Sequence, residues 1–189
     1  MKKKWSLVLG VLLLAGVLVG AASAYHLLAG KTSPVTPSAG SAASTTSGTS
    51  VGQKAPDITV TDRDGKTLRL SSLRGKPVVL NFWASWCPPC QEEMPDYQSL
   101  YKEYGNQVSF VMVDMVGARG ETVSAGEAFL SQNKYTFPAY FDTEGAAADV
   151  YGITSIPRSY YIDKSGVIRA KFEGVMNNKQ MESAMQTIL

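Results

Sequence analysis

Both cysteines of the 189-residue chain lie in one stretch, Val78–Pro95, whose sequence VVLNFWASWCPPCQEEMP leaves few choices of local structure. The apolar run that ends at Trp83 is typical of a buried strand. A helix is predicted from about Gln91 to Tyr104, directly after the second cysteine. The free N–H groups and the positive end of the dipole at a helix start favour a thiolate over a thiol. The sequence therefore predicts a strand, a tight turn and a helix, with an acidified cysteine, Cys87, at the turn.

The spacing of Cys87 and Cys90 favours reversible redox chemistry. One helical turn separates them, which is close enough for a disulfide. A purely structural disulfide is one alternative, but so short a loop removes little entropy from the unfolded chain. A metal site is another, but two thiolates fill only half of a tetrahedral shell, and the single histidine, His26, lies in the N-terminal part. We therefore expect a redox pair and no bound metal.

Residues 1–30 have the pattern of a membrane anchor. Lys2–Lys4 precede an uncharged apolar run from Trp5 to about Tyr25, which is long enough for a helix to cross a bilayer. The basic cluster predicts that the N-terminus stays in the cytoplasm and the rest is exported. A signal peptide cleaved before Tyr25 is the competing interpretation, because Ala22-Ser23-Ala24 resembles a cleavage site. The apolar run is longer than a usual signal-peptide core, which favours the uncleaved, single-pass anchor.

Residues 31–50 are mostly Ser, Thr, Ala, Gly and Pro, which cannot bury a core, so we expect a flexible tether. The folded domain is then expected over residues 51–189. Of the 18 Lys and Arg residues, four precede residue 51, which leaves 14 against all 16 Asp and Glu. Such a balance gives no reason to expect binding to nucleic acid.

The rest of the domain alternates strand and helix patterns. Short strands are predicted at Ile58–Val60 and Leu68–Leu70, a buried strand at Val108–Val113, helices at Ala125–Asn133, Ala146–Tyr151 and Asn177–Leu189, and a hairpin at Ser159–Ile162 and Val167–Phe172. Two parallel strands followed by an antiparallel hairpin, with helices on both faces of a central mixed sheet, indicate a thioredoxin-like α/β fold with an N-terminal β-hairpin extension.

Two motifs resemble a known family. NFWASWCPPC at Asn81–Cys90, followed by GITSIP at Gly152–Pro157, resembles the thioredoxin superfamily. The details resemble its TlpA/ResA-like branch, which consists of membrane-anchored bacterial thiol–disulfide oxidoreductases. The resemblance covers nearly all of residues 51–189, including the N-terminal hairpin that plain thioredoxins lack.

The resemblance also implies roles for individual residues. Cys87 would be the attacking thiol, Cys90 the resolving thiol, and Pro157 the cis-proline that faces the pair. Further residues are expected to line the groove that accepts an extended substrate: Trp83, Trp86, Pro88, Ile156 and Arg158.

Four positions bear on proton transfer and specificity. Thioredoxin has a buried aspartate where this chain has Asn81, which cannot take a proton. Glu93 matches a glutamate that the branch places three residues after the second cysteine, so we expect it to accept the proton of the resolving thiol. Glu121 matches a loop acid of the branch and is a possible second acid. Arg158 stands where the family usually has Thr, which leaves the partner specificity open.

The implied function is reduction of disulfides in exported proteins, such as apocytochrome c during cytochrome c maturation, with no cofactor. A membrane protein of the CcdA/DsbD type would re-reduce the oxidised domain. Three alternatives remain open from the sequence: an oxidase that installs disulfides, a redoxin-type antioxidant protein, and a copper-binding chaperone that uses both thiolates.

Overall fold

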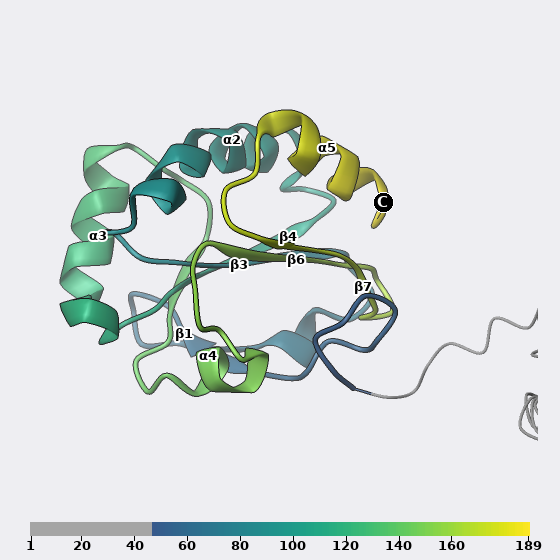
Figure 1. Cartoon of the computed structure of the whole chain (residues 1–189), viewed down its shortest axis with the longest axis horizontal. Coiled ribbons are helices and arrows are strands. Elements are labelled where there is room, and N and C mark those ends of the chain that lie inside the picture. The colour runs from purple at the N-terminus through teal and green to yellow at the C-terminus, as the bar shows by residue number, and fades with distance from the viewer. Residues whose placement is uncertain (1–46) are drawn as a thin grey trace, which may run out of the picture. The chain divides into compact units, whose positions relative to one another are not determined.

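The computed structural model describes residues 47–189, which form a seven-stranded mixed sheet with helices on both faces (Figure 1). The strands are β1 (Thr59–Thr61), β2 (Thr67–Arg69), β3 (Val78–Trp83), β4 (Ser109–Asp114), β5 (Ala139–Phe141), β6 (Arg158–Ile162) and β7 (Ile168–Glu173). The helices are α2 (Pro88–Tyr104), α3 (Val123–Gln132), α4 (Ala146–Tyr151) and α5 (Asn178–Gln186), with short 3₁₀ turns η1 (Leu70–Leu73) and η2 (Ala118–Gly120).

The sheet confirms the predicted thioredoxin-like topology. Its strand order is β2-β1-β5-β4-β3-β6-β7. The central strand β3 pairs in parallel with β4 and antiparallel with β6, and every one of its residues is buried. A near-continuous apolar strand is what a position covered on both faces requires. The short strand β5 adds a further parallel strand beside β4.

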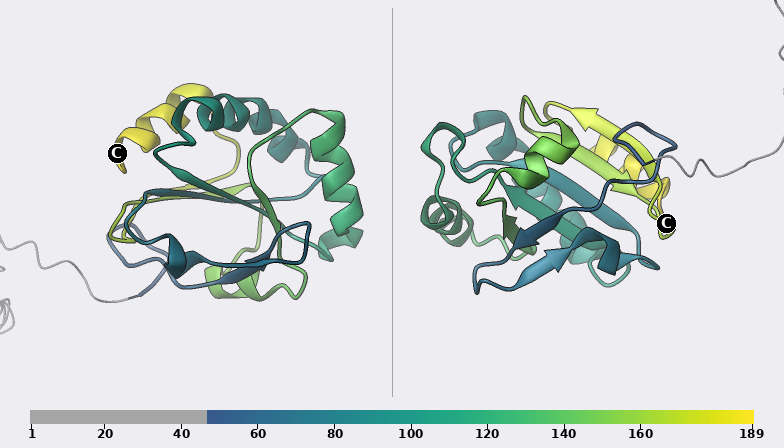
Figure 2. Two further views of the ribbon diagram at one scale, coloured as in Figure 1. Left: turned by 180° about the vertical axis from the view of Figure 1, so that it is seen from behind. Right: turned by 90° about the horizontal axis from the view of Figure 1, so that it is seen from below.

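Two apolar clusters fill the spaces on either side of the sheet. Helices α2 and α5 lie together over one face, and α4 lies on the opposite face (Figures 1 and 2). Met94 of α2 and Met181 and Met185 of α5 are fully buried in the first cluster. Leu80 of β3 and Tyr151 of α4 are buried in the second cluster. The rigid sheet between these clusters fixes where β3 ends and α2 begins.

The N-terminal hairpin is present. β1 and β2 pair antiparallel, and β1 joins the main sheet through Thr61 opposite Phe141. The folded part extends further towards the N-terminus than expected, because Ser47 bridges to Lys54 and the Gly48 N–H donates to the Lys54 carbonyl at 3.0 Å. The predicted membrane segment, residues 1–30, lies outside the described residues. Among residues 47–189, no helix has the length and apolar character needed to span a bilayer.

Helix α2 begins at Pro88, three residues before the predicted start. Proline suits the first helical positions because its missing N–H would have no partner there. Cys87 is therefore the N-cap of α2, and its Sγ accepts a hydrogen bond from the Cys90 N–H at 3.3 Å. The first cysteine thus lies at the helix terminus, and the second lies inside the first turn.

Candidate active site

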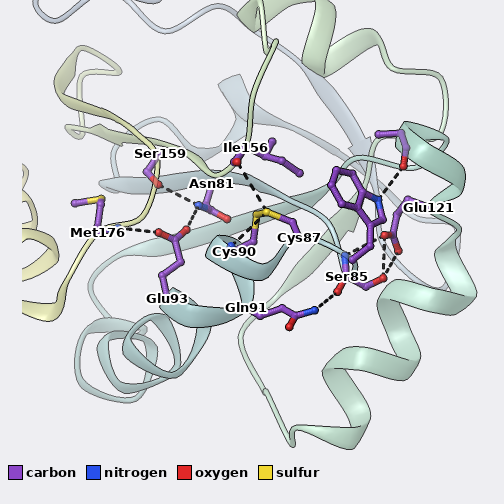
Figure 3. Close-up of a disulfide and its surroundings, with 12 residues drawn as sticks. Asn81, Ser85, Cys87, Cys90, Gln91, Glu93, Glu121, Ile156, Ser159 and Met176 are labelled. Carbon is purple, nitrogen blue, oxygen red and sulfur yellow. Dashed lines mark hydrogen bonds between the residues drawn. A yellow bond between two sulfur atoms is a disulfide. The ribbon is translucent and has the colours of Figure 1, made fainter.

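Cys87 and Cys90 form a disulfide at the junction of β3 and α2, with their Cα atoms 5.2 Å apart (Figure 3). The loop before β6 faces them, and Cys87 Sγ lies 3.8 Å from the Ile156 carbonyl oxygen. The Ile156–Pro157 peptide bond is cis, which is the geometry that the resemblance implies. The sheet thus brings together two motifs that lie almost 70 residues apart in the sequence.

A groove of about 380 Å³ opens onto Cys87. Trp86, Pro88 and Ile156 line this groove, as the sequence analysis expected. Cys90 is not among the lining residues and is completely buried. An incoming partner therefore meets the sulfur of Cys87 and not that of Cys90.

Two residues predicted to line the groove do not. Trp83 is fully buried, with its ring 5.7 Å from that of Phe129, because its side chain points into the core under α3. Arg158 is also buried, and its Nη1 lies 2.9 Å from Glu173 Oε1 on the neighbouring strand β7. Pairing in the antiparallel β6–β7 hairpin turns Arg158 towards Glu173. Both predictions were wrong.

Glu93 lies inside the protein and is not a solvated helix residue. It is completely buried, and its carboxylate accepts hydrogen bonds from Asn81 Nδ2 at 3.0 Å and from the Met176 N–H at 3.2 Å (Figure 3). Burial raises its pKa to about 7, because a carboxylate is less well solvated there than in water. Glu93 can therefore gain or lose a proton near neutral pH.

The rest of this buried polar network was not predicted from the sequence. Asn81 Nδ2 also donates to Ser159 Oγ at 3.0 Å, and the hydroxyl groups of Ser159 and Tyr97 lie 2.7 Å apart. Tyr97 is fully buried at an apolar position of α2, where helical periodicity gives no sign that its hydroxyl joins a polar network. Ser159 is a small polar residue in an otherwise bulky strand, and that contrast was the available signal. Asn81 thus orients Glu93, although it cannot titrate.

Glu121 supports the turn that leads into the cysteine pair. It is buried, and its carboxylate accepts hydrogen bonds from the Ser85 N–H at 3.0 Å and the Ser85 hydroxyl at 2.8 Å. A second contact joins the same loop to the turn, because Trp86 Nε1 donates to the Ala118 carbonyl at 2.9 Å. The loop of residues 115–121 is therefore attached to the Ser85-Trp86 turn at two points.

Asp114, at the end of β4, is a further buried acid, which was not predicted from the sequence. It is completely buried, and neither carboxylate oxygen has a hydrogen-bond partner among the described residues. Burial, and to a lesser degree the negative charge of Glu121, raise the pKa of Asp114 to about 8. At neutral pH Asp114 is therefore mainly protonated and uncharged, so it does not repel the neighbouring Glu121.

A redox disulfide at a helix N-terminus, a cis-proline loop facing it and a thioredoxin-like sheet define the class of protein: a thiol–disulfide oxidoreductase. Residues 51–171 match the model of the AhpC/TSA family, and the chain belongs to this family.

Individual relatives agree with this class. The thioredoxin-like protein YneN of Bacillus subtilis is 38% identical over 134 residues, which cover 71% of this chain and 78% of YneN. The thiol-disulfide oxidoreductase ResA of Bacillus thuringiensis is 35% identical over 139 residues, which cover 73% of this chain and 78% of ResA. Among solved structures, the pneumococcal exposed lipoprotein thioredoxin of Streptococcus pneumoniae aligns with a TM-score of 0.62 at 31% identity, covering 70% of this chain and all of that one. These relatives confirm the resemblance to ResA-like oxidoreductases.

Proposed function

We propose that the protein reduces disulfides in exported proteins, with apocytochrome c as a candidate substrate. The observation that carries this proposal is the asymmetry of the site. Cys87 lines an open groove, whereas Cys90 and Glu93 are fully buried one helical turn apart on α2. An attacking thiol that lines the groove, although only 2% of Cys87 is exposed, and a resolving thiol buried away from the groove with a base on its own helix suit a two-step exchange with a protein partner.

The exchange begins with the reduced dithiol. The Cys87 thiolate attacks one sulfur of the partner disulfide, a mixed disulfide forms, and the other partner sulfur leaves as a thiolate that takes up a proton. Glu93 then accepts the proton of the Cys90 thiol, and the Cys90 thiolate attacks Cys87 Sγ. The Cys87–Cys90 disulfide forms, and the second partner sulfur leaves as a thiolate that takes the proton held by Glu93. The partner gains two electrons from the dithiol, one proton that came from Cys90 and one proton from solvent, and a membrane donor of the CcdA/DsbD type would restore the dithiol.

The test is a measurement of activity together with reduction potential. The purified domain should reduce insulin or a disulfide-bonded apocytochrome peptide, with a potential at or below about −200 mV, in the range of reducing thioredoxin-like proteins. A potential of about −120 mV would instead show that the protein is an oxidase. Stoichiometric Cu(I) binding without reductase activity would assign it as a copper chaperone.

We also propose that the domain works outside the cytoplasm, held by an uncleaved helix within residues 1–30. The basic cluster and long apolar run support this proposal, and one structural relative is named as an exposed lipoprotein. The full-length chain should sediment with bacterial membranes and stay there after a high-salt wash. Recovery of a soluble extracytoplasmic form that begins at Tyr25 would show that the segment is a cleaved signal.

A further inference from the structure

The groove beside Cys87 carries one charged side chain, Arg119. The other residues that line it, all within the described part of the chain, are uncharged. Arg119 is exposed, and its guanidinium carbon lies 4.9 Å from the centroid of the Trp86 ring. A cation in this position is attracted to the ring face, which holds it over the groove.

The backbone around Arg119 is shaped to present this side chain. Arg119 has φ 49° and ψ 35°, a left-handed conformation that residues other than glycine rarely adopt. Gly117 and Gly120 on either side also have positive φ values, of 85° and 82°, so the loop turns tightly around Arg119. Such conformations persist where the surrounding structure enforces them, and they concentrate at sites that bind or react.

The two hydrogen-bonded attachments of the loop to the Ser85-Trp86 turn hold Arg119 in this conformation. Ala118, directly before Arg119, accepts the Trp86 indole N–H, and Glu121, two residues after it, binds Ser85. Arg119 is therefore fixed between two contacts to the turn that carries Cys87. The hydrogen bonds from Ser85 occupy the carboxylate of Glu121, which is the acidic group closest in sequence to Arg119.

Arg119 has no acidic partner within residues 47–189: none of the ion pairs of that part of the chain includes it. A guanidinium that rests on an aromatic face keeps its N–H edge free, and this edge matches the two oxygens of a carboxylate. The groove thus combines an apolar floor, a reactive sulfur and one unpaired cation. Its chemistry is complementary to an extended polypeptide with a cysteine and a nearby acidic side chain.

We propose that Arg119 makes the groove selective for partner disulfides that have Asp or Glu next to the reacting cysteine. This inference rests on the proposed reductase function and adds the chemical class of its substrate. An acidic neighbour pairs with Arg119 while its cysteine meets Cys87. A basic neighbour at the same place is repelled and leaves the groove before exchange.

The test uses three synthetic peptides with the same intramolecular disulfide, in which the residue before the first cysteine is Glu, Gln or Lys. The second-order rate constant for oxidation of the reduced domain is measured with each peptide. At low ionic strength the Glu peptide should react about threefold faster than the Gln peptide, as expected for one exposed ion pair, and the Lys peptide should be slowest. Salt should reduce these ratios.

Variants assign the preference to Arg119. Arg119→Gln should bring the three rate constants close to one another, while Arg119→Lys should keep the order Glu, Gln, Lys. Arg63→Gln is the matched control, because it removes the same charge from an exposed turn between β1 and β2 and should keep the wild-type ratios.

Two results would overturn the inference. One is equal rates with all three peptides for the wild type, and the other is an unchanged preference in Arg119→Gln. If Arg119→Gln slowed all three reactions by one common factor, Arg119 would act on the thiol of Cys87 and not on the partner, and the inference would also fail. A wild-type domain that reduced none of the peptides would instead contradict the reductase function itself.

Discussion

The Cys90→Ser variant is expected to accumulate mixed disulfides between Cys87 and partner proteins, whereas Cys87→Ser is expected to form none. Cys87 lines the groove with 2% of its surface exposed, whereas Cys90 is completely buried and does not line the groove. Without Cys90 nothing resolves the bond that Cys87 forms, and without Cys87 the first bond cannot form. Turnover in disulfide reduction should fall to the uncatalysed background in both variants.

Non-reducing electrophoresis and mass spectrometry after exposure to a disulfide-bonded peptide measure this difference. The double variant that lacks both thiols is the control for non-specific adducts, and a small dithiol should release every true adduct. Adducts on Cys87→Ser but not on Cys90→Ser would show that the attacking and resolving roles are reversed.

Replacing Glu93 by glutamine should slow reductase turnover roughly 10²-fold, the loss typical of removing one acid–base group. Because the pKa of Glu93 is raised to about 7 by burial, the carboxylate is largely protonated below that pH and largely ionised above it. A base must be ionised to accept the proton of Cys90, so the wild-type rate of mixed-disulfide resolution should rise as pH increases through about 7. Glu93→Gln should lose this rise, and mixed disulfides should persist in it.

Glu92→Gln is the matched control, because Glu92 is the adjacent, exposed residue of the same helix and should give wild-type rates. Glu121→Gln should have a smaller effect than Glu93→Gln, since Glu121 bonds Ser85 and contacts neither sulfur through a hydrogen bond. Rapid-quench measurement of mixed-disulfide decay from pH 5 to 9 tests these expectations. A Glu93→Gln variant with the wild-type rate and pH profile would show that another group or water takes the proton.

Local patterns predicted most of the fold. The apolar run of β3 and the periodicity of α2 and α5 depend on residues close in sequence, and these elements agree with the structure to within a few residues. The site was harder to predict, because its side chains are placed by contacts across the sheet. Trp83 belongs to the active-site motif but points into the core, and Arg158 follows the cis-proline but pairs with Glu173. Asp114 ends an apolar strand, and no local pattern indicates that its carboxylate is buried.

The loop of residues 115–121 separates the choice of partner from the chemistry. It lies between β4 and α3, and its side-chain hydrogen bonds to the turn before the cysteine pair involve the Trp86 indole and Ser85. The segment between these contacts can change in length or charge without altering helix α2, which carries Cys90 and Glu93 and has Cys87 as its N-cap. Evolution or design could therefore vary this loop to change which proteins the enzyme reduces, while its thiol chemistry stays intact.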